Sequence, residues 1–175
     1  MAFDTFVYFP GSESVVPGET QDDIMKQNKA FEIISFELGC KNDINIGSIS
    51  AGGGSSKATF DPFSFTKNTD SASCGLHANL CEGKHFPDCV IELRRSGGAA
   101  GASGATFLKF ELKLVMVEEI SWQGSDGADV CEENVVLQYG AIKITYFKQD
   151  TTGAMAEDSQ SMFSRVTNKA DFTVN

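Results

Sequence analysis

Hydrophobic and polar residues alternate over most of the chain, and this period of two is typical of β-strands that bury one face. The longest clean run is Ala105–Val117, where charged residues occupy intervening positions. Its apolar positions are Leu108, Phe110, Leu112, Leu114 and Met116. The run predicts one long strand whose apolar face is buried and whose lysines and glutamates face solvent.

A second long run, Asn134–Lys148, changes its phase in the middle. Apolar residues stand at odd positions up to Tyr139 and at even positions from Ile142 onward. A shift by one residue would turn all later side chains to the other face of the sheet. We therefore expect a β-bulge at Gly140, which would bend the strand as in a barrel or at a sandwich corner.

Shorter runs of β-forming residues predict five further strands. They are Phe3–Phe9, Phe31–Gly39, Phe63–Thr66, Cys89–Arg95 and Ala170–Asn175. In the second of them, Ile34, Phe36 and Leu38 form one apolar face. Strand alternation sends Ser35 and Glu37 to the opposite side.

Glycine-rich and polar segments separate these strands and predict exposed loops. They are Ser48–Lys57 and Ser96–Ala105, while Thr151–Ser161 is a further loop and Pro10–Lys29 is a long insertion between two strands. We expect a short helical turn near Asp23–Asn28 in this insertion.

One segment, Asp70–Cys81, carries the signals of an α-helix. Asp70 is a candidate N-cap, and Gly83 stands where a left-handed C-terminal residue belongs. Leu76 and Leu80 are spaced to share one buried face. Together these patterns predict a mainly β protein, a compact β-barrel or two-sheet domain with one short flanking helix. Residues 1–175 should form a single domain.

Charge and composition exclude several classes of function. The 175 residues carry 14 Lys and Arg against 24 Asp and Glu, a formal net charge of −10. This charge opposes binding to nucleic acid or to an anionic membrane surface, so neither partner is expected. No apolar stretch is long enough for membrane insertion, and the N-terminal residues lack the pattern of a signal peptide. We expect synthesis in the cytoplasm, where the five cysteines would stay reduced.

Three of these cysteines lie near both histidines in the sequence. The residues are Cys74, His77, Cys81, His85 and Cys89, all of types that bind zinc. The helix should end near Gly83, so the last two side chains need not face the first three. We expect the thiols to pack as small hydrophobes, with no metal and no cofactor. A small zinc or thiol enzyme is the alternative.

Two pairs of adjacent carboxylates offer little for catalysis. Glu118–Glu119 and Glu132–Glu133 stand at strand ends, and neighbours on a strand point to opposite faces. We interpret them as a solvated acidic rim and predict no catalytic residue.

Several segments, in one order, resemble a known family. They are FSFTKNTDSAS, GKHFPDCVIELRRSGG, FLKFELKLVMVEEIS and ENVVLQYGAIKITYF. The chain resembles the Hcp (haemolysin-coregulated protein) tube family of bacterial type VI secretion systems. Its most specific elements are the SFTK…D segment ending at Asp70 and the turn after the helix, which holds Gly83, Lys84, His85 and Pro87.

This resemblance implies a structural protein. Six copies would form a ring with an open lumen, and rings would stack into the inner tube of a contractile machine. Effector proteins would travel in the lumen, and sheath, baseplate and tip proteins would be the other partners. The type VI machine would carry the protein out of the cell. A tail-tube protein of a phage-like contractile injection particle is the alternative.

The same resemblance assigns roles to two segments. Ser35 and Glu37 would face the lumen. The loop that touches the next ring would contain Ala51, Gly52, Gly53, Gly54, Ser55 and Ser56. Because such loops lose much entropy on ordering, deleting Ala51–Ser56 should leave rings intact and reduce their stacking.

Overall fold

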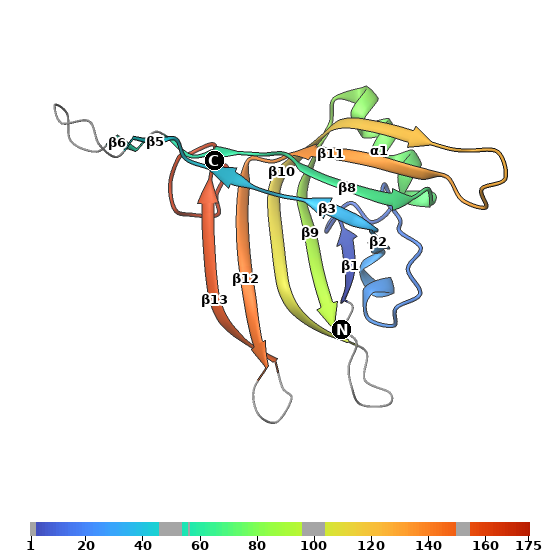
Figure 1. Ribbon diagram of the computed structural model, residues 1–175, viewed down its shortest axis with the longest axis horizontal. Helices are drawn as coiled ribbons and strands as arrows, with labels where there is room; N and C mark the ends of the chain where they lie inside the picture. Colours follow the sequence, from blue (N-terminus) through green and yellow to red (C-terminus); the bar gives the residue numbers. More distant parts are fainter. Residues whose placement is uncertain (1–2, 46–53, 56, 96–103, 150–154) are drawn as a thin grey trace.

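The computed structural model describes residues 3–45, 54–55, 57–95, 104–149 and 155–175. Antiparallel strands dominate these residues, which also hold one α-helix and one 3-10 helix (Figure 1). The elements are β1 (Phe3–Tyr8), η1 (Met25–Asn28), β2 (Phe31–Glu32), β3 (Ser35–Glu37), β4 (Cys40–Lys41), β5 (Ile44–Asn45), β6 (Gly54–Ser55), β7 (Thr59–Phe60), β8 (Phe63–Asn68), α1 (Ser71–Glu82), β9 (His85–Arg95), β10 (Ala105–Gln123), β11 (Glu132–Gln138), β12 (Ala141–Gln149) and β13 (Met155–Ser164). The predicted mainly β class with one helix is therefore confirmed. Neither helix in this part of the chain is long and apolar enough to cross a membrane.

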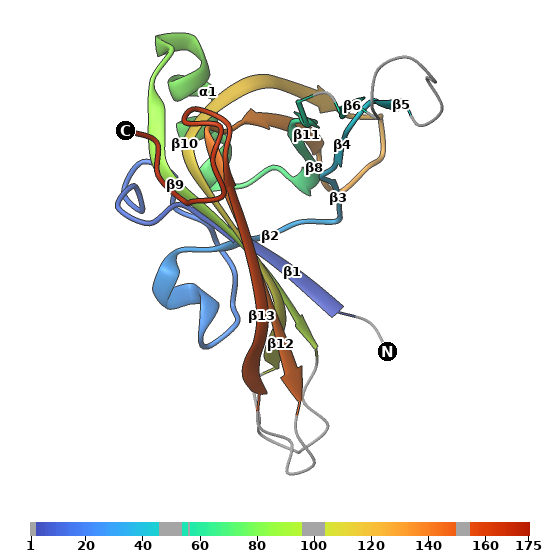
Figure 2. The same cartoon turned by 90° about the vertical axis from the view of Figure 1, so that its left-hand side faces the viewer.

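The main sheet of the described residues has nine strands and is built around β10, which is 19 residues long. Its strands pair in the order β2–β1–β9–β10–β11–β8–β3, and β12 joins β10 to β13. Both β11 and β12 pair with β10, β12 along residues 108–113 and β11 along residues 116–123. In Figure 1, β9, β10, β12 and β13 run steeply, while β3 and β8 cross in front of their upper parts. In Figure 2 the crossing strands lie to one side of the steep ones.

The two end strands of this sheet, β2 and β3, are neighbours in the chain but do not pair with each other. Between them, Ile33 donates its amide to the Thr5 carbonyl at 3.0 Å, and Ile34 donates to the Thr66 carbonyl at 2.7 Å. Successive amides of an extended chain point to opposite sides, so this segment passes from β1 to β8. A barrel closed by strand pairing, one of the two expected architectures, is not formed in the described residues.

A left-handed residue in β10 changes which side chains are buried. Leu114 has a φ of 52°. After it, the buried positions are Val115 and Val117, whereas Met116 is 42% exposed. The prediction that Leu114 and Met116 continue the buried face was wrong, because the irregular residue shifts the alternation by one.

The phase change at Gly140 is confirmed as a bend, although it separates β11 from β12 and does not bulge one continuous strand. The Gly140 amide donates to the Lys113 carbonyl at 2.8 Å. A Cβ at this position would lie 3.1 Å from the Cβ of Leu114. Gly140 and Leu114 therefore pack closely, and this short distance favours glycine at position 140.

The C-terminal region differs from the predicted one. Strand β13 occupies much of the segment Thr151–Ser161 that was expected to be a loop, and Ala170–Asn175 forms no strand. β13 pairs with β12 along its whole length. Its sequence shows no alternation, and its conformation depends on the partner strand, so local propensity could not reveal it.

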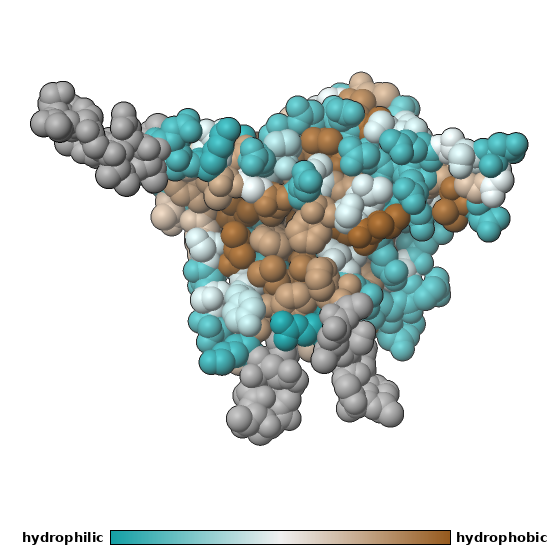
Figure 3. All heavy atoms as spheres, viewed as in Figure 1, coloured by the Kyte–Doolittle hydropathy of each residue, from teal (hydrophilic) through white to brown (hydrophobic). Residues whose placement is uncertain are grey.

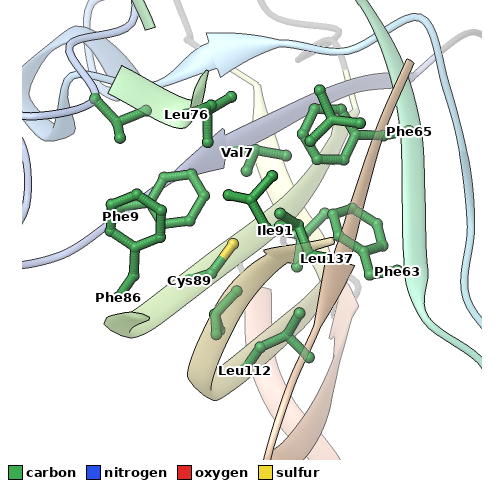
Figure 4. Close-up of a cluster of buried hydrophobic side chains, with 14 of the residues drawn as sticks. Val7, Phe9, Phe63, Phe65, Leu76, Phe86, Cys89, Ile91, Leu112 and Leu137 are labelled. Atoms are coloured by element: carbon green, nitrogen blue, oxygen red, sulfur yellow. The ribbon is translucent and has the colours of Figure 1, made fainter. Parts of the chain in front are cut away.

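The core lies where the crossing strands cover β1, β9 and β10 (Figure 4). Its buried side chains include Val7, Phe9, Phe63, Phe65, Leu76, Phe86, Cys89, Ile91, Leu112 and Leu137. Aromatic rings meet in tilted pairs, such as Phe63 and Phe65 with 5.2 Å between ring centroids. Burying a side chain of this size contributes about 1.5–3 kcal/mol, so this cluster is the main source of stability.

The long connection between β1 and β2, predicted as an insertion between two strands, packs against the molecule. Val16 and Met25 are buried, and η1 forms the predicted helical turn. The Glu19 carboxylate accepts hydrogen bonds from the backbone amide and the hydroxyl of Ser71 at the start of α1. The connection thus supports the helix.

Candidate assembly surfaces

Asp70 and Gly83 cap the two ends of α1, as predicted. The Asp70 carboxylate accepts from the Ala72 amide at 2.9 Å, and the Ser73 hydroxyl accepts from the Asp70 amide at 3.1 Å. This is a capping box. Gly83 has a φ of 64° and donates its amide to the Leu80 carbonyl at 3.3 Å. Both ends of the helix are therefore encoded locally.

The lysine of the SFTK…D segment attaches the helix to the sheet. The Lys67 ammonium is fully buried and donates to Asp70 at 2.7 Å, Glu133 at 3.0 Å and Ser73 at 3.2 Å. The Trp122 indole also donates to Glu133, at 2.8 Å. Buried charges persist only when they are paired and hydrogen-bonded. This buried ion network joins β8, β11 and α1.

The network corrects part of the predicted acidic rim. Glu132 is exposed, whereas its neighbour Glu133 is 1% exposed, so the two do point to opposite faces. Glu133 does not belong to a solvated rim, because strand register places it opposite Lys67 on β8. Glu118 and Glu119 are both exposed, as expected of a rim.

The turn after the helix lies at the surface and is anchored by one buried ring. Lys84 pairs with Glu82 at 2.5 Å, and His85 and Pro87 are exposed. Phe86 between them is 2% exposed and belongs to the core cluster. The family-like turn residues thus shape the entry into β9.

The candidate zinc ligands do not converge. Cys89 is buried in the core, whereas Cys74, Cys81 and both histidines are exposed. In the described part of the chain, no three His, Cys, Asp or Glu side chains are grouped to hold a metal ion. The expectation that thiols pack as small hydrophobes holds for Cys89, where burial raises the thiol pKa. It was wrong for Cys74 and Cys81, which lie on the solvent side of the helix.

A row of apolar side chains on β10 and β12 continues beyond the part of the sheet that β3 and β8 cover. We call this surface the open apolar face, and it consists of Phe3, Phe107, Leu108, Phe110, Ile144 and Tyr146. Across the β10–β12 pair, Leu112 faces Ile142, Phe110 faces Ile144, and Leu108 faces Tyr146. Exposure grows in that direction, from 7% at Ile142 to 36% at Ile144 and 40% at Tyr146. Figure 3 shows apolar side chains gathered in the middle of this side of the molecule.

The other side of the same strands is charged. Glu111 pairs with Lys109 at 3.6 Å and with Lys143 at 3.3 Å. These strands therefore have one polar face and one apolar face that the described residues cover only in part: Phe110 contacts Phe36 of β3, whereas Ile144 and Tyr146 are more than a third exposed. Neighbouring exposed apolar side chains of this kind are typical of a site of association.

Ser35 and Glu37 belong to a different surface, the outer side of β3, β8 and β11. Pairing aligns Ser35 with Thr66 and Glu37 with Ser64. Both predicted residues are exposed. They border a shallow hollow in which Glu37 is the single charged residue among those that line it.

The prediction for the opposite, apolar face of Phe31–Gly39 was correct only in part. Phe36 and Leu38 pack against the core cluster. Ile34 was expected to join them but is 58% exposed. The chain changes neighbours at this residue, so the alternation does not extend across it.

The predicted stacking loop falls mostly outside the described residues. Ala51, Gly52, Gly53 and Ser56 lie in the part that is not described. Gly54 and Ser55 form β6, which pairs with β5. The effect of deleting this loop stays a prediction.

Comparisons with known proteins agree on one family. A family model described as "Type VI secretion system effector, Hcp" matches residues 6–146. The protein hcp1 of Pseudomonas aeruginosa is 33% identical over 98 residues, which cover 56% of this chain and 59% of that protein. The match thus spans less than two thirds of that relative.

Solved structures share the fold over nearly the whole chain. One described as a type six secretion system protein has a TM-score of 0.83 and 27% identity, and the match covers 96% of this chain and 99% of that one. Hcp1 from Salmonella typhimurium has a TM-score of 0.71 and 24% identity, with 97% and 99% covered. At 24% identity, the similarity to Hcp1 from Salmonella typhimurium shows a shared fold and nothing more.

Proposed function

The chain belongs to the Hcp family of type VI secretion system proteins, and on this basis we propose that it is a structural subunit of the secretion tube and not an enzyme. Copies of the chain associate side by side into a ring, with six copies as the family resemblance implies. Rings stack into a tube whose lumen holds effector proteins. The protein is made in the bacterial cytoplasm and leaves through the type VI machine, where sheath, baseplate and tip proteins are its further partners.

The open apolar face is the observation that carries this proposal. It lies on a rigid sheet, so a partner can cover it without a change in the fold. A ring requires a head-to-tail contact, in which this face meets a different surface of the next copy. Covering the exposed parts of Ile144 and Tyr146 removes apolar surface from water, which favours association, and every subunit of a closed ring repeats the contact.

Placing two charges on this face should prevent assembly. We expect the double variant Ile144→Asp and Tyr146→Asp to sediment as a monomer where the wild-type chain sediments as a ring, because each contact would bury unpaired carboxylates. Both side chains are more than a third exposed in the single chain, so the fold should survive. Native mass spectrometry and far-UV circular dichroism measure the two properties.

Lys148→Asp is the control for the added negative charge, since Lys148 is exposed near the end of the same strand and its replacement removes no apolar side chain. It should still form rings. Rings of unchanged mass in the double variant would show that another surface joins the subunits. A wild-type chain that stays monomeric at tens of micromolar would contradict the tube function itself.

We propose that the hollow beside Glu37 faces the lumen and contacts cargo. Repeated around a ring, Glu37 forms a band of negative charge that favours basic cargo, an effect that salt screens. Glu37→Arg should leave ring formation unchanged, because the side chain is exposed and has no core contact, while binding of a basic test protein falls at low salt. Co-sedimentation with rings measures this.

Ser35→Arg adds a positive charge at another residue that borders the same hollow. It tests whether binding of the basic protein depends on this surface and not on position 37 alone. Loss of rings in Glu37→Arg would place Glu37 in a subunit contact. Unchanged binding of the basic protein at low salt would contradict the placement of Glu37 in the lumen.

A further inference from the structure

Cys81 and His77 form an exposed pair on α1 that is not part of the open apolar face. The Cys81 Sγ lies 3.6 Å from Nε2 and 4.0 Å from Nδ1 of His77. Residues four apart occupy neighbouring positions on one side of a helix, and both of these are exposed. An accessible thiol therefore lies beside a proton acceptor.

The imidazole lies beside an indole ring that is tied to the buried ion network. Its ring centroid lies 5.8 Å from that of Trp122, with 55° between the ring planes. Trp122 donates its indole N–H to Glu133, and the buried Lys67 holds Glu133 in place. A thiol, a base and an orienting group are the three parts that activate a sulfur nucleophile.

Cys74 provides an internal comparison on the same helix. It is exposed like Cys81, but among the described contacts the His77 ring meets the sulfur of Cys81 and not that of Cys74. The two cysteines are seven residues apart, a rise of about 10.5 Å along the helix axis. A disulfide spans at most about 7 Å between Cα atoms, so these two thiols cannot join each other. Cys89 is buried in the core.

We propose that Cys81 is a modification site at which a low-molecular-weight disulfide, such as glutathione disulfide, forms a mixed disulfide with the protein. His77 accepts the thiol proton, and the Cys81 sulfur attacks one sulfur of the reagent. A protein–reagent S–S bond forms while the S–S bond of the reagent breaks. The departing thiolate takes the proton from the imidazolium and leaves as a thiol. This inference is independent of the tube function.

The redox conditions of the compartment determine how long the adduct persists. Free thiols in a reducing cytosol reverse the exchange, whereas oxidising surroundings preserve it. The adduct would thus distinguish chains that have met an oxidising environment from those that have stayed in the cytosol.

The test measures each cysteine separately in the intact protein. Purified protein is incubated with glutathione disulfide, quenched with acid at intervals, digested and analysed by mass spectrometry. Cys81 should react about tenfold faster than Cys74, since general bases accelerate proton removal at least to this extent. His77→Ala should slow Cys81 to the rate of Cys74, while Cys74→Ser should leave Cys81 unchanged. Cys89 should stay unmodified, which shows that the core is closed.

Equal rates at Cys81 and Cys74 in the wild-type protein would overturn the proposal, and so would an undiminished rate at Cys81 in His77→Ala. If His77→Ala fails to fold, as modification of Cys89 would reveal, His77→Asn provides the same comparison with a polar side chain that is not a base.

Discussion

Replacing Lys67 with methionine is expected to lower the free energy of unfolding by about 3–5 kcal/mol. The ammonium is fully buried and supplies the positive charge between Asp70 and Glu133, at 2.7 and 3.0 Å. Without it, the buried carboxylate of Glu133 keeps neutral donors but loses its counter-charge. Urea unfolding at a fixed protein concentration measures the loss, because assembly would otherwise shift the midpoint.

Two further variants separate charge from packing. Adding Glu133→Gln to Lys67→Met should recover part of the loss, since the amide removes the unpaired charge and still accepts hydrogen bonds. Lys84→Met breaks the exposed pair with Glu82 and should cost less than about 1 kcal/mol. A loss below about 1 kcal/mol in Lys67→Met would mean that the buried ion network does not stabilise the fold.

Gly75→Ala should destabilise the protein by about 2–3 kcal/mol, although the same change inside most helices is stabilising. A Cβ on Gly75 would lie 1.7 Å from the Val15 carbonyl oxygen and 2.7 Å from its carbon. Both atoms are backbone, so the connection between β1 and β2 must move away from the helix. Thermal unfolding measures the stability, and limited proteolysis of the 10–29 segment should become faster.

Ala78→Gly on the exposed side of the helix is the matched control. It should cost about 1 kcal/mol through helix propensity and leave proteolysis of the connection unchanged. A stabilised Gly75→Ala protein would show that the connection is not packed against the helix in solution.

Local features that the sequence carries were sufficient for the helix and for several strand faces. Asp70 and Gly83 end the helix through contacts with residues at most four positions away, so their chemistry can be read from the chain. Phe63 and Phe65 alternate with polar residues and are buried as a pair. The phase change at Gly140 marked a true bend. In each case a local pattern marks the feature, although only for the ends of the helix are the determining interactions themselves short in sequence.

The tertiary structure decided the features that depend on distant partners. Lys67 meets a carboxylate 66 residues away. Strand alternation puts Lys67 on the buried face of β8 and Glu133 on that of β11, but only the pairing of the two strands shows that they neutralise each other. Strand β13 forms because it pairs with the edge of β12. The left-handed residue Leu114 shifts the alternation of buried side chains in β10, next to Gly140. Apolar alternation along Ala105–Val117 predicted burial for every residue of one face, yet the crossing strands cover only part of it. Alternation states which side of a strand avoids water, whereas the length and path of other segments determine what covers that side. The uncovered part of the face is therefore visible only in the folded chain.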